Sequence, residues 1–169
     1  MHRFILALSC ILMMLAAPIS AQDLFKGLEA SLNGDWTAAL KEFKPLAEGG
    51  NRTAEDQLGH YYYQGKGVPQ NYKEAVKWFI LASEQGSFVA QRQLGNMYKN
   101  GEGVPQDYKE AIKWYRLAAE KGSVLAQYNL GIMHRKGQGV PKDHREAAKW
   151  YKLAAEQGDA DAQYNVGVT

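Results

Sequence analysis

The sequence predicts an all-α protein, an α-solenoid of stacked helix pairs, and three observations support this fold class. The first is a self-repeat with a period of 36 residues. The residues that recur at this spacing are Gly59, Gly95, Gly131 and Gly167; Trp78, Trp114 and Trp150; and Pro69, Pro105 and Pro141. The second is the helical spacing of apolar residues in each half of the repeat, and the third is the presence of capping residues at the expected helix ends. A period of about 20–50 residues indicates stacked repeats rather than one globular core.

Residues 1–21 are predicted to be a secretory signal peptide. A short positively charged start precedes an apolar run from Phe4 to Ala17, and small residues lead up to Ala21. Cleavage after Ala21 would make the mature chain periplasmic or secreted. The alternative is a retained membrane anchor, although a membrane span normally needs about 20 apolar residues.

The composition argues against several classes of function. Cys10 is the only cysteine and lies in the predicted signal peptide, so the mature chain would have no disulfide, thiol nucleophile or zinc–thiolate site. Removal of Arg3 would leave 19 of the 20 Lys and Arg residues beside 18 Asp and Glu, whereas a nucleic-acid-binding protein shows a strong basic excess. No second apolar stretch is long enough to span a membrane. We therefore expect no nucleic-acid partner and no stable membrane span after signal cleavage.

Residues 22–50 form a predicted N-terminal helix pair that departs from the repeat. A short link at residues 33–35 replaces the longer loop of the other units, and Gly27 precedes Gly59 by 32 residues rather than 36. The second helix of this pair keeps a helical spacing, with Trp36, Ala39, Phe43 and Leu46. Atypical end units are expected in a stack because they cap it.

Three full repeats are predicted, at residues 51–86, 87–122 and 123–158, and each begins with a helix. Good N-cap residues open these helices and the partial one that follows: Asn51, Ser87, Ser123 and Asp159. A glycine in the middle of a helix normally costs about 1 kcal/mol relative to alanine, yet one recurs in every unit, as at Gly59. We attribute it to close packing, with an aromatic ring of the second helix lying where a side chain would clash.

A loop of the form G-x-G-V-P joins the two helices of each repeat. Its first glycine permits a positive φ at the end of the first helix, and its proline prevents the helix from continuing. A phosphate-binding interpretation of G-x-G is disfavoured, because that fingerprint needs a preceding strand and a third glycine opening a helix.

Each second helix is predicted to be amphipathic and capped at both ends. In residues 71–85 one face carries the apolar residues Ala75, Trp78, Phe79 and Ala82. Asn71 and Glu74 form a capping-box pattern, and Glu74 with Lys77 should contribute about 0.2–0.5 kcal/mol as an i,i+3 pair. Glycines follow the last turns, at Gly86, Gly122 and Gly158. The recurring aromatic residues are predicted to be core rather than a platform for a cofactor or glycan.

Residues 159–169 form a predicted partial terminal repeat, which ends near the middle of a first helix. This half-unit covers the helix of Trp150 but has no second helix of its own. Its open apolar face leads us to expect that a homodimer could form there.

The segment from Ala90 to Gly122 resembles the Sel1-like repeat, a relative of the tetratricopeptide repeat. The matching residues are Ala90, Leu94, Gly95, Tyr98, Gly101, Gly103, Val104, Asp107, Ala111, Trp114, Ala118, Ala119 and Gly122. The resemblance extends over residues 54–167, and the unit before it is similar to a tetratricopeptide repeat. The departures are Asn71 in place of Asp, Ser83 in place of Ala and His134 in place of Tyr. The resemblance implies a right-handed α-solenoid that acts as a non-catalytic adaptor.

Secreted bacterial members of this family resemble the chain in architecture. Some regulate or assemble envelope signalling and export, and some contribute to host interaction. The resemblance therefore implies an adaptor for a protein or peptide partner. The alternative is a cell-wall-related β-lactamase-like or penicillin-binding activity, as described for cysteine-rich relatives. This chain lacks their cysteines and a serine–lysine motif, which disfavours that activity.

The predicted binding surface is the face of the first helices whose residues change between repeats, because unchanged positions must pack. In tetratricopeptide-like stacks these helices line the concave groove. The candidate partner-binding residues are Asp56, His60 and Tyr63; Arg92, Asn96 and Lys99; Tyr128 and Arg135; and Tyr164. A strip of Tyr, Asn, Arg and Lys suits an extended peptide, since Tyr and Arg anchor interfaces and basic groups hold carboxylates. The alternative is a solvated face that binds nothing.

No catalytic residue, metal site or cofactor is predicted. The mature chain has three histidines, His60, His134 and His144, and no pair has metal-ligand spacing on one helix. Ser87 and Ser123 are interpreted as helix caps rather than nucleophiles. Spacing alone leaves open a site assembled from residues far apart in the sequence.

Overall fold

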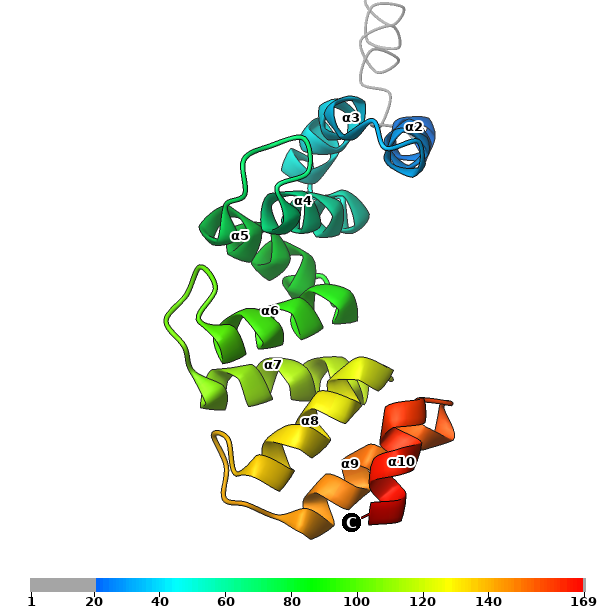
Figure 1. The fold of residues 1–169 in the computed structure, drawn as a ribbon. Helices are drawn as coiled ribbons and strands as arrows, with labels where there is room; N and C mark the ends of the chain where they lie inside the picture. The colour runs from blue at the N-terminus through cyan, green and yellow to red at the C-terminus, as the bar shows by residue number, and fades with distance from the viewer. Residues whose placement is uncertain (1–20, 169) are drawn as a thin grey trace, which may run out of the picture.

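The computed structural model describes residues 21–168, and all regular secondary structure in this part of the chain is helical. The helices are α2 (Ala21–Leu32), α3 (Trp36–Glu48), α4 (Arg52–Gln64), α5 (Tyr72–Glu84), α6 (Phe88–Asn100), α7 (Tyr108–Glu120), α8 (Val124–Lys136), α9 (His144–Glu156) and α10 (Ala160–Val168). Figure 1 shows them stacked in chain order as an elongated array with the long loops along one edge. The predicted class, an all-α right-handed solenoid of helix pairs, is confirmed. Apart from Ala21, the predicted signal peptide with Cys10 lies outside the described residues.

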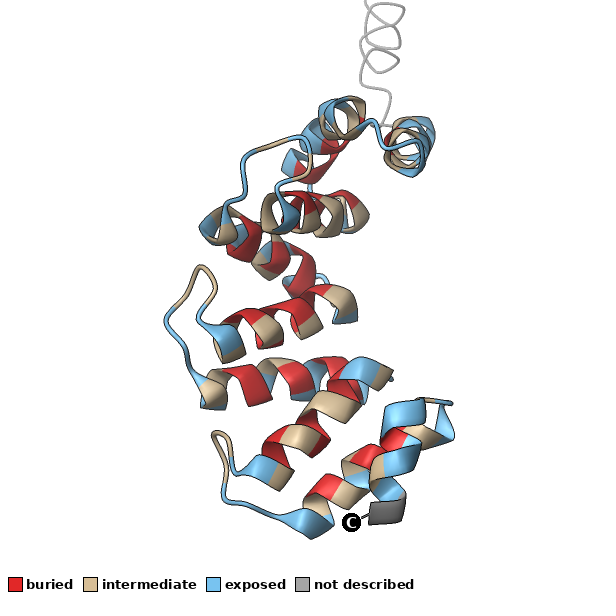
Figure 2. Cartoon of the chain, in the orientation of Figure 1, coloured by how far each residue is buried: buried red, intermediate tan, exposed pale blue. Residues whose placement is uncertain are grey.

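The hydrophobic core of the array lies between successive units. Each buried cluster joins the second helix of one unit to the first helix of the next, pairing α3 with α4, α5 with α6, α7 with α8 and α9 with α10. Figure 2 shows buried residues along neighbouring helices and exposed residues on the loops. Half-buried Trp78 of α5 packs against the α3–α4 cluster, and Trp114 and Trp150 repeat this contact one and two units later. The tryptophans therefore link each unit to the core before it.

Within each pair, the two helices meet at a glycine and an aromatic ring. A Cβ atom placed on Gly95 would lie 2.5 Å from Cδ1 of Tyr115, whose side chain is fully buried. The same contact occurs in every described pair of this kind: Gly27 with Phe43, Gly59 with Phe79 and Gly131 with Tyr151. This confirms the predicted reason for the glycines, since any side chain there would overlap the ring.

The second helices are capped differently from the predicted capping box. The side chain of Asn71 accepts the N–H of Glu74 at 3.1 Å, as expected. The reciprocal bond is absent, because the Glu74 carboxylate pairs with Lys77 at 2.8 Å and the N–H of Asn71 donates to the carbonyl of Tyr62 at 2.8 Å. Asp107 and Asp143 bond back to the preceding first helix in the same way, at 2.9 Å each. Each loop is therefore fastened to the helix it leaves.

Three of the four predicted N-caps of the first helices use their side chains. Asn51, Ser87 and Asp159 accept a backbone N–H three residues later, at 3.0, 3.1 and 2.7 Å. Ser123 has the backbone conformation of a cap, but its hydroxyl makes no capping hydrogen bond. Ser123 is therefore the N-cap residue, as predicted, but without the side-chain hydrogen bond, since residue type alone does not set the orientation of a hydroxyl.

The second glycine of each loop has a role that the sequence analysis did not predict. Gly103 has φ +73°, and a Cβ atom there would lie 2.6 Å from the carbonyl oxygen of Tyr72, at the start of the preceding second helix. Gly139 stands in the same relation to Tyr108. These loops therefore pack against the backbone of the previous repeat and add to the contact between units.

The contact between Gly95 and Tyr115 predicts that Gly95→Ala destabilises the protein. We expect the free energy of unfolding to fall by about 1–3 kcal/mol, because the added methyl group overpacks a closely filled site. Urea denaturation followed by circular dichroism measures the change. Helix propensity alone predicts a gain of up to about 1 kcal/mol, so an unchanged or higher stability would contradict the packing argument. Asn100→Ala, at an exposed position of the same helix, is the control and should change stability by less than about 0.5 kcal/mol.

Candidate protein-interaction surface

The candidate partner-binding residues all lie on the first helices of their units, and we call this set the variable face. Its members are Asp56, His60 and Tyr63 on α4; Arg92, Asn96 and Lys99 on α6; Tyr128 and Arg135 on α8; and Tyr164 on α10. The side chain of Tyr164 is 73% exposed, whereas the other eight residues are partly buried. The set is therefore a row along consecutive repeats, and whether it lines a concave groove stays a prediction.

On α4 the polar groups of the variable face are bonded within the chain. The carboxylate of Asp56 accepts the Ser87 hydroxyl at 2.7 and 2.9 Å, which ties α4 to the cap of α6. The hydroxyl of Tyr63 donates to Glu102 at 3.0 Å, and its ring packs against Tyr72. Burial, and then the Glu102 carboxylate, raises the pKa of Tyr63 to about 12. This end of the face is thus largely committed to the fold.

His60 is packed rather than free. Its ring meets the Phe79 ring edge-on, with 5.1 Å between the centroids. Burial lowers the pKa of His60 to about 4, and the positive charges of Arg92 and Lys66 contribute further. The imidazole is therefore neutral near pH 7 and adds no charge to the variable face.

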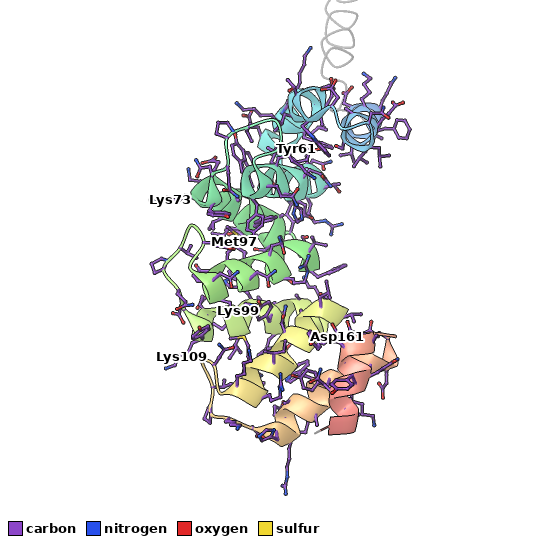
Figure 3. All side chains as sticks on the ribbon, viewed as in Figure 1. Tyr61, Lys73, Met97, Lys99, Lys109 and Asp161 are labelled. Atoms are coloured by element: carbon purple, nitrogen blue, oxygen red, sulfur yellow. The ribbon has the colours of Figure 1, made fainter. Side chains whose placement is uncertain are left out.

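On α6, Asn96 is bonded within the chain but the two cations are not. Its side-chain oxygen accepts the Tyr115 hydroxyl at 2.6 Å, and its amide donates to Gln93 at 3.0 Å. Arg92 and Lys99 form no ion pair with any residue in the described part of the chain. Burial lowers the pKa of both groups, so each cation is partly desolvated. At Lys99 the negative charge of Glu102 opposes this effect, although the two side chains form no ion pair. Figure 3 shows Lys99 toward the loop end of α6.

Two buried polar atoms near the α8 part of the variable face, one on α8 and one on α9, have no hydrogen-bond partner among the described residues. These are Nε of Arg135 and the hydroxyl oxygen of Tyr151, whose ring packs against Tyr128 at 5.6 Å between centroids. Arg135 lies near enough for its charge to oppose the rise that burial causes in the pKa of Tyr151, yet the two make no well-formed hydrogen bond. A buried donor without a partner is costly, so a hydrogen-bond acceptor from a bound molecule would stabilise the Arg135 guanidinium.

Two loop residues beside the variable face, Lys66 and Glu102, were not predicted from the sequence; they lie at equivalent positions of successive repeats. Glu102 reaches the variable face by accepting the Tyr63 hydroxyl. The ammonium of Lys66 lies 4.3 Å from the centroid of the Trp36 ring, a cation–π distance. The residue between the two loop glycines is Lys66, Glu102 or Gln138 in successive repeats. This variation between constant glycines could have identified the position as part of the variable surface.

The described residues include no cluster of three or more His, Cys, Asp or Glu side chains placed to hold a metal ion. His60, His134 and His144 lie on three different helices, α4, α8 and α9.

Within residues 21–168, none of the helices combines the length and the apolar character that a membrane crossing requires.

Stacked helix pairs with constant packing positions and a variable face define a helix-pair repeat protein. The chain belongs to the Sel1 repeat family, whose model matches residues 53–87, 89–123 and 124–159. Sel1 repeat proteins are generally protein-interaction scaffolds, and their fold is typically non-catalytic. A comparison with curated protein sequences gave no match.

Solved structures agree with this assignment. The chain is similar to a Sel1 repeat protein from Oxalobacter formigenes, with 34% identity and a TM-score of 0.81 over 86% of this chain and 60% of that one. It is also similar to c5321, a protective antigen of uropathogenic Escherichia coli with an SLR fold, with 41% identity and a TM-score of 0.79 over 83% and 31% of the two chains. Cysteine-rich protein B of Helicobacter pylori, at 23% identity and a TM-score of 0.61, covers 76% of this chain and 96% of its own, and supports the fold alone. The chain thus spans 60% and 31% of the length of the first two proteins.

The low pKa of His60 predicts a loss of stability in mild acid. An unfolded histidine takes up a proton near pH 6.5, whereas the folded one does so at about pH 4, so stability falls as the pH falls between these values. His60→Asn, which introduces the residue found at position 96, should reduce this loss. Urea midpoints measured at pH 7 and pH 4.5 test the difference. His144→Asn, which removes an exposed imidazole, is the control; an equal effect of both substitutions would contradict the assignment to His60.

Proposed function

We propose that this protein is a periplasmic or secreted adaptor that binds a protein or peptide partner along the variable face. The observation that carries the proposal is the contrast within that face. Asp56, Tyr63 and Asn96 are bonded inside the chain, whereas Arg92, Lys99 and Arg135 are partly buried cations without an ion-pair partner in the described residues. Groups of this kind gain hydrogen bonds or ion pairs only from an external molecule.

The repeat architecture supports a protein partner over a small ligand. Constant positions hold the helices together, so variable positions are free to differ between units without loss of packing. Tyrosine and arginine, which contribute strongly to protein interfaces, occur here at Tyr128, Arg135 and exposed Tyr164. The location rests on the predicted signal peptide and on the resemblance to secreted members of the family. A role in envelope signalling or in host interaction is the biological setting that we propose.

Affinity capture from chemically crosslinked cell envelope tests the proposal. The tagged wild type should retain a partner that the Arg92→Ala/Tyr128→Ala/Arg135→Ala variant loses, because the substitutions remove three anchors from the variable face. Bound proteins are identified by mass spectrometry, and circular dichroism should show unchanged helical content.

A second triple variant, Lys77→Ala/Lys113→Ala/Lys149→Ala, provides the matched control. It removes exposed lysines from the second helices and should retain the partner. If wild type and the Arg92/Tyr128/Arg135 variant capture the same proteins, the variable face is not the binding surface.

A further inference from the structure

We propose that the α6 and α8 portion of the variable face binds an acidic segment of the partner, an extended chain with several Asp or Glu side chains. This inference rests on the proposed function and specifies the chemistry of the partner. Three cations of this face carry it, Arg92 and Lys99 on α6 and Arg135 on α8, together with the exposed Lys136 that follows Arg135 at the end of α8.

The four cations form no ion pair inside the chain as described. None of the four cations lies within ion-pair distance of a carboxylate among residues 21–168. Three lysines of the second helices differ in this respect, because Lys77, Lys113 and Lys149 each pair with a glutamate, at 2.8, 2.6 and 2.8 Å. Other cations of the second helices, such as Lys73 and Lys109, also lack an ion pair but are exposed. Partial burial together with the missing ion pair therefore distinguishes Arg92, Lys99 and Arg135.

Three of the four cations are also partly buried. Arg92, Lys99 and Arg135 are partly buried, and Nε of Arg135 has no hydrogen-bond partner. The charge of Lys136 lowers the pKa of Lys99 further, after burial itself, while the Glu102 carboxylate opposes the shift and leaves the Lys99 pKa lowered. Desolvated cations that repel one another are unfavourable alone, and a carboxylate brought between them would offset that cost.

The charge of the variable side chains changes from the first full repeat to the second. Position 56 of the first repeat is an aspartate, while the equivalent residue of the second repeat is Arg92. At the variable position seven residues further along the helix, Tyr63 of the first repeat is followed by Lys99 and then Arg135 in the next two repeats. The two acids nearest this face, Asp56 on α4 and Glu102 in the loop after α6, are already hydrogen-bonded, Asp56 to Ser87 and Glu102 to Tyr63. The acidic part of a bound chain should therefore lie over α6 and α8.

The placement of the cations favours a chain over a small anion. They occupy the first helices of two successive repeats, so one small carboxylate or phosphate would engage only part of the set. Guanidinium groups such as those of Arg92 and Arg135 bind carboxylates with two parallel hydrogen bonds. Several carboxylates spaced along an extended peptide match this arrangement.

Selection from a random 12-residue peptide library tests the inference. The purified chain, at low salt, should select peptides enriched in Asp and Glu by about twofold or more over the starting library. Arg92→Gln/Lys99→Gln/Arg135→Gln should lose this enrichment. Lys77→Gln/Lys113→Gln/Lys149→Gln removes the same charge from ion-paired positions and should keep it. For a fluorescein-labelled selected peptide, we expect Kd to rise about tenfold or more in the first variant and less than about twofold in the second.

The outcomes separate this inference from the proposed function. Peptides without acidic enrichment that still require Arg92, Tyr128 and Arg135 would overturn the acidic partner and leave the variable face as the binding surface. Acidic peptides that bind both triple variants equally would place the site elsewhere. Displacement of the labelled peptide by heparin or single-stranded RNA at equal charge concentration would show a general polyanion surface and overturn a protein segment as the ligand. Failure to select any peptide would also contradict the inference, while envelope capture still judges the proposed function.

Discussion

The structure depends on one repeated contact, an aromatic ring lying directly against the backbone of a neighbouring helix at a glycine. In the second full repeat this places Tyr115 on Gly95, and the same geometry holds from Gly27 to Gly131. The contact brings the two helices of each pair close together and fixes the position of the ring. In the second repeat it also places the Tyr115 hydroxyl beside Asn96, so the packing sets the position of a residue on the variable face.

A second constraint joins the pairs to one another. Because the buried clusters lie between units, a helix pair without neighbours would expose the apolar face that its tryptophan and the next first helix cover. Close loop contacts, such as Gly103 against the backbone of Tyr72, reinforce the same interface. Stability therefore comes from the stack as a whole. Some outer positions of the first helices also join neighbouring units, as Asp56 does with Ser87 and Tyr63 with Glu102. Arg92, Lys99 and Arg135 form no ion pair within the described residues and are the positions left for recognition.

Periodicity made most of this fold predictable from the sequence. The spacing of apolar residues identified the helices. The recurrence of glycine at positions 59, 95 and 131 correctly predicted a close contact with an aromatic ring. Orientation of individual polar groups was not predictable. The N–H of Asn71 donates to a backbone carbonyl of the previous helix instead of forming the reciprocal bond of a capping box. The Ser123 hydroxyl makes no capping hydrogen bond. For the variable face, the sequence identified the candidate residues but not which of them the fold itself uses. That distinction arises from tertiary contacts such as Ser87 with Asp56 and Glu102 with Tyr63.

The bonds from each loop back to its own first helix have a consequence for how such arrays change length. The carbonyls of Tyr62, Tyr98 and His134 accept these bonds at equivalent positions of the three full repeats. The loop of each full repeat therefore has the same hydrogen bond to its first helix. A whole unit can therefore be duplicated or deleted without altering the caps on either side. The length of such an array therefore changes in steps of one 36-residue unit. The length of partner that it spans is then set by the number of units, independently of the side chains that give each unit its preference.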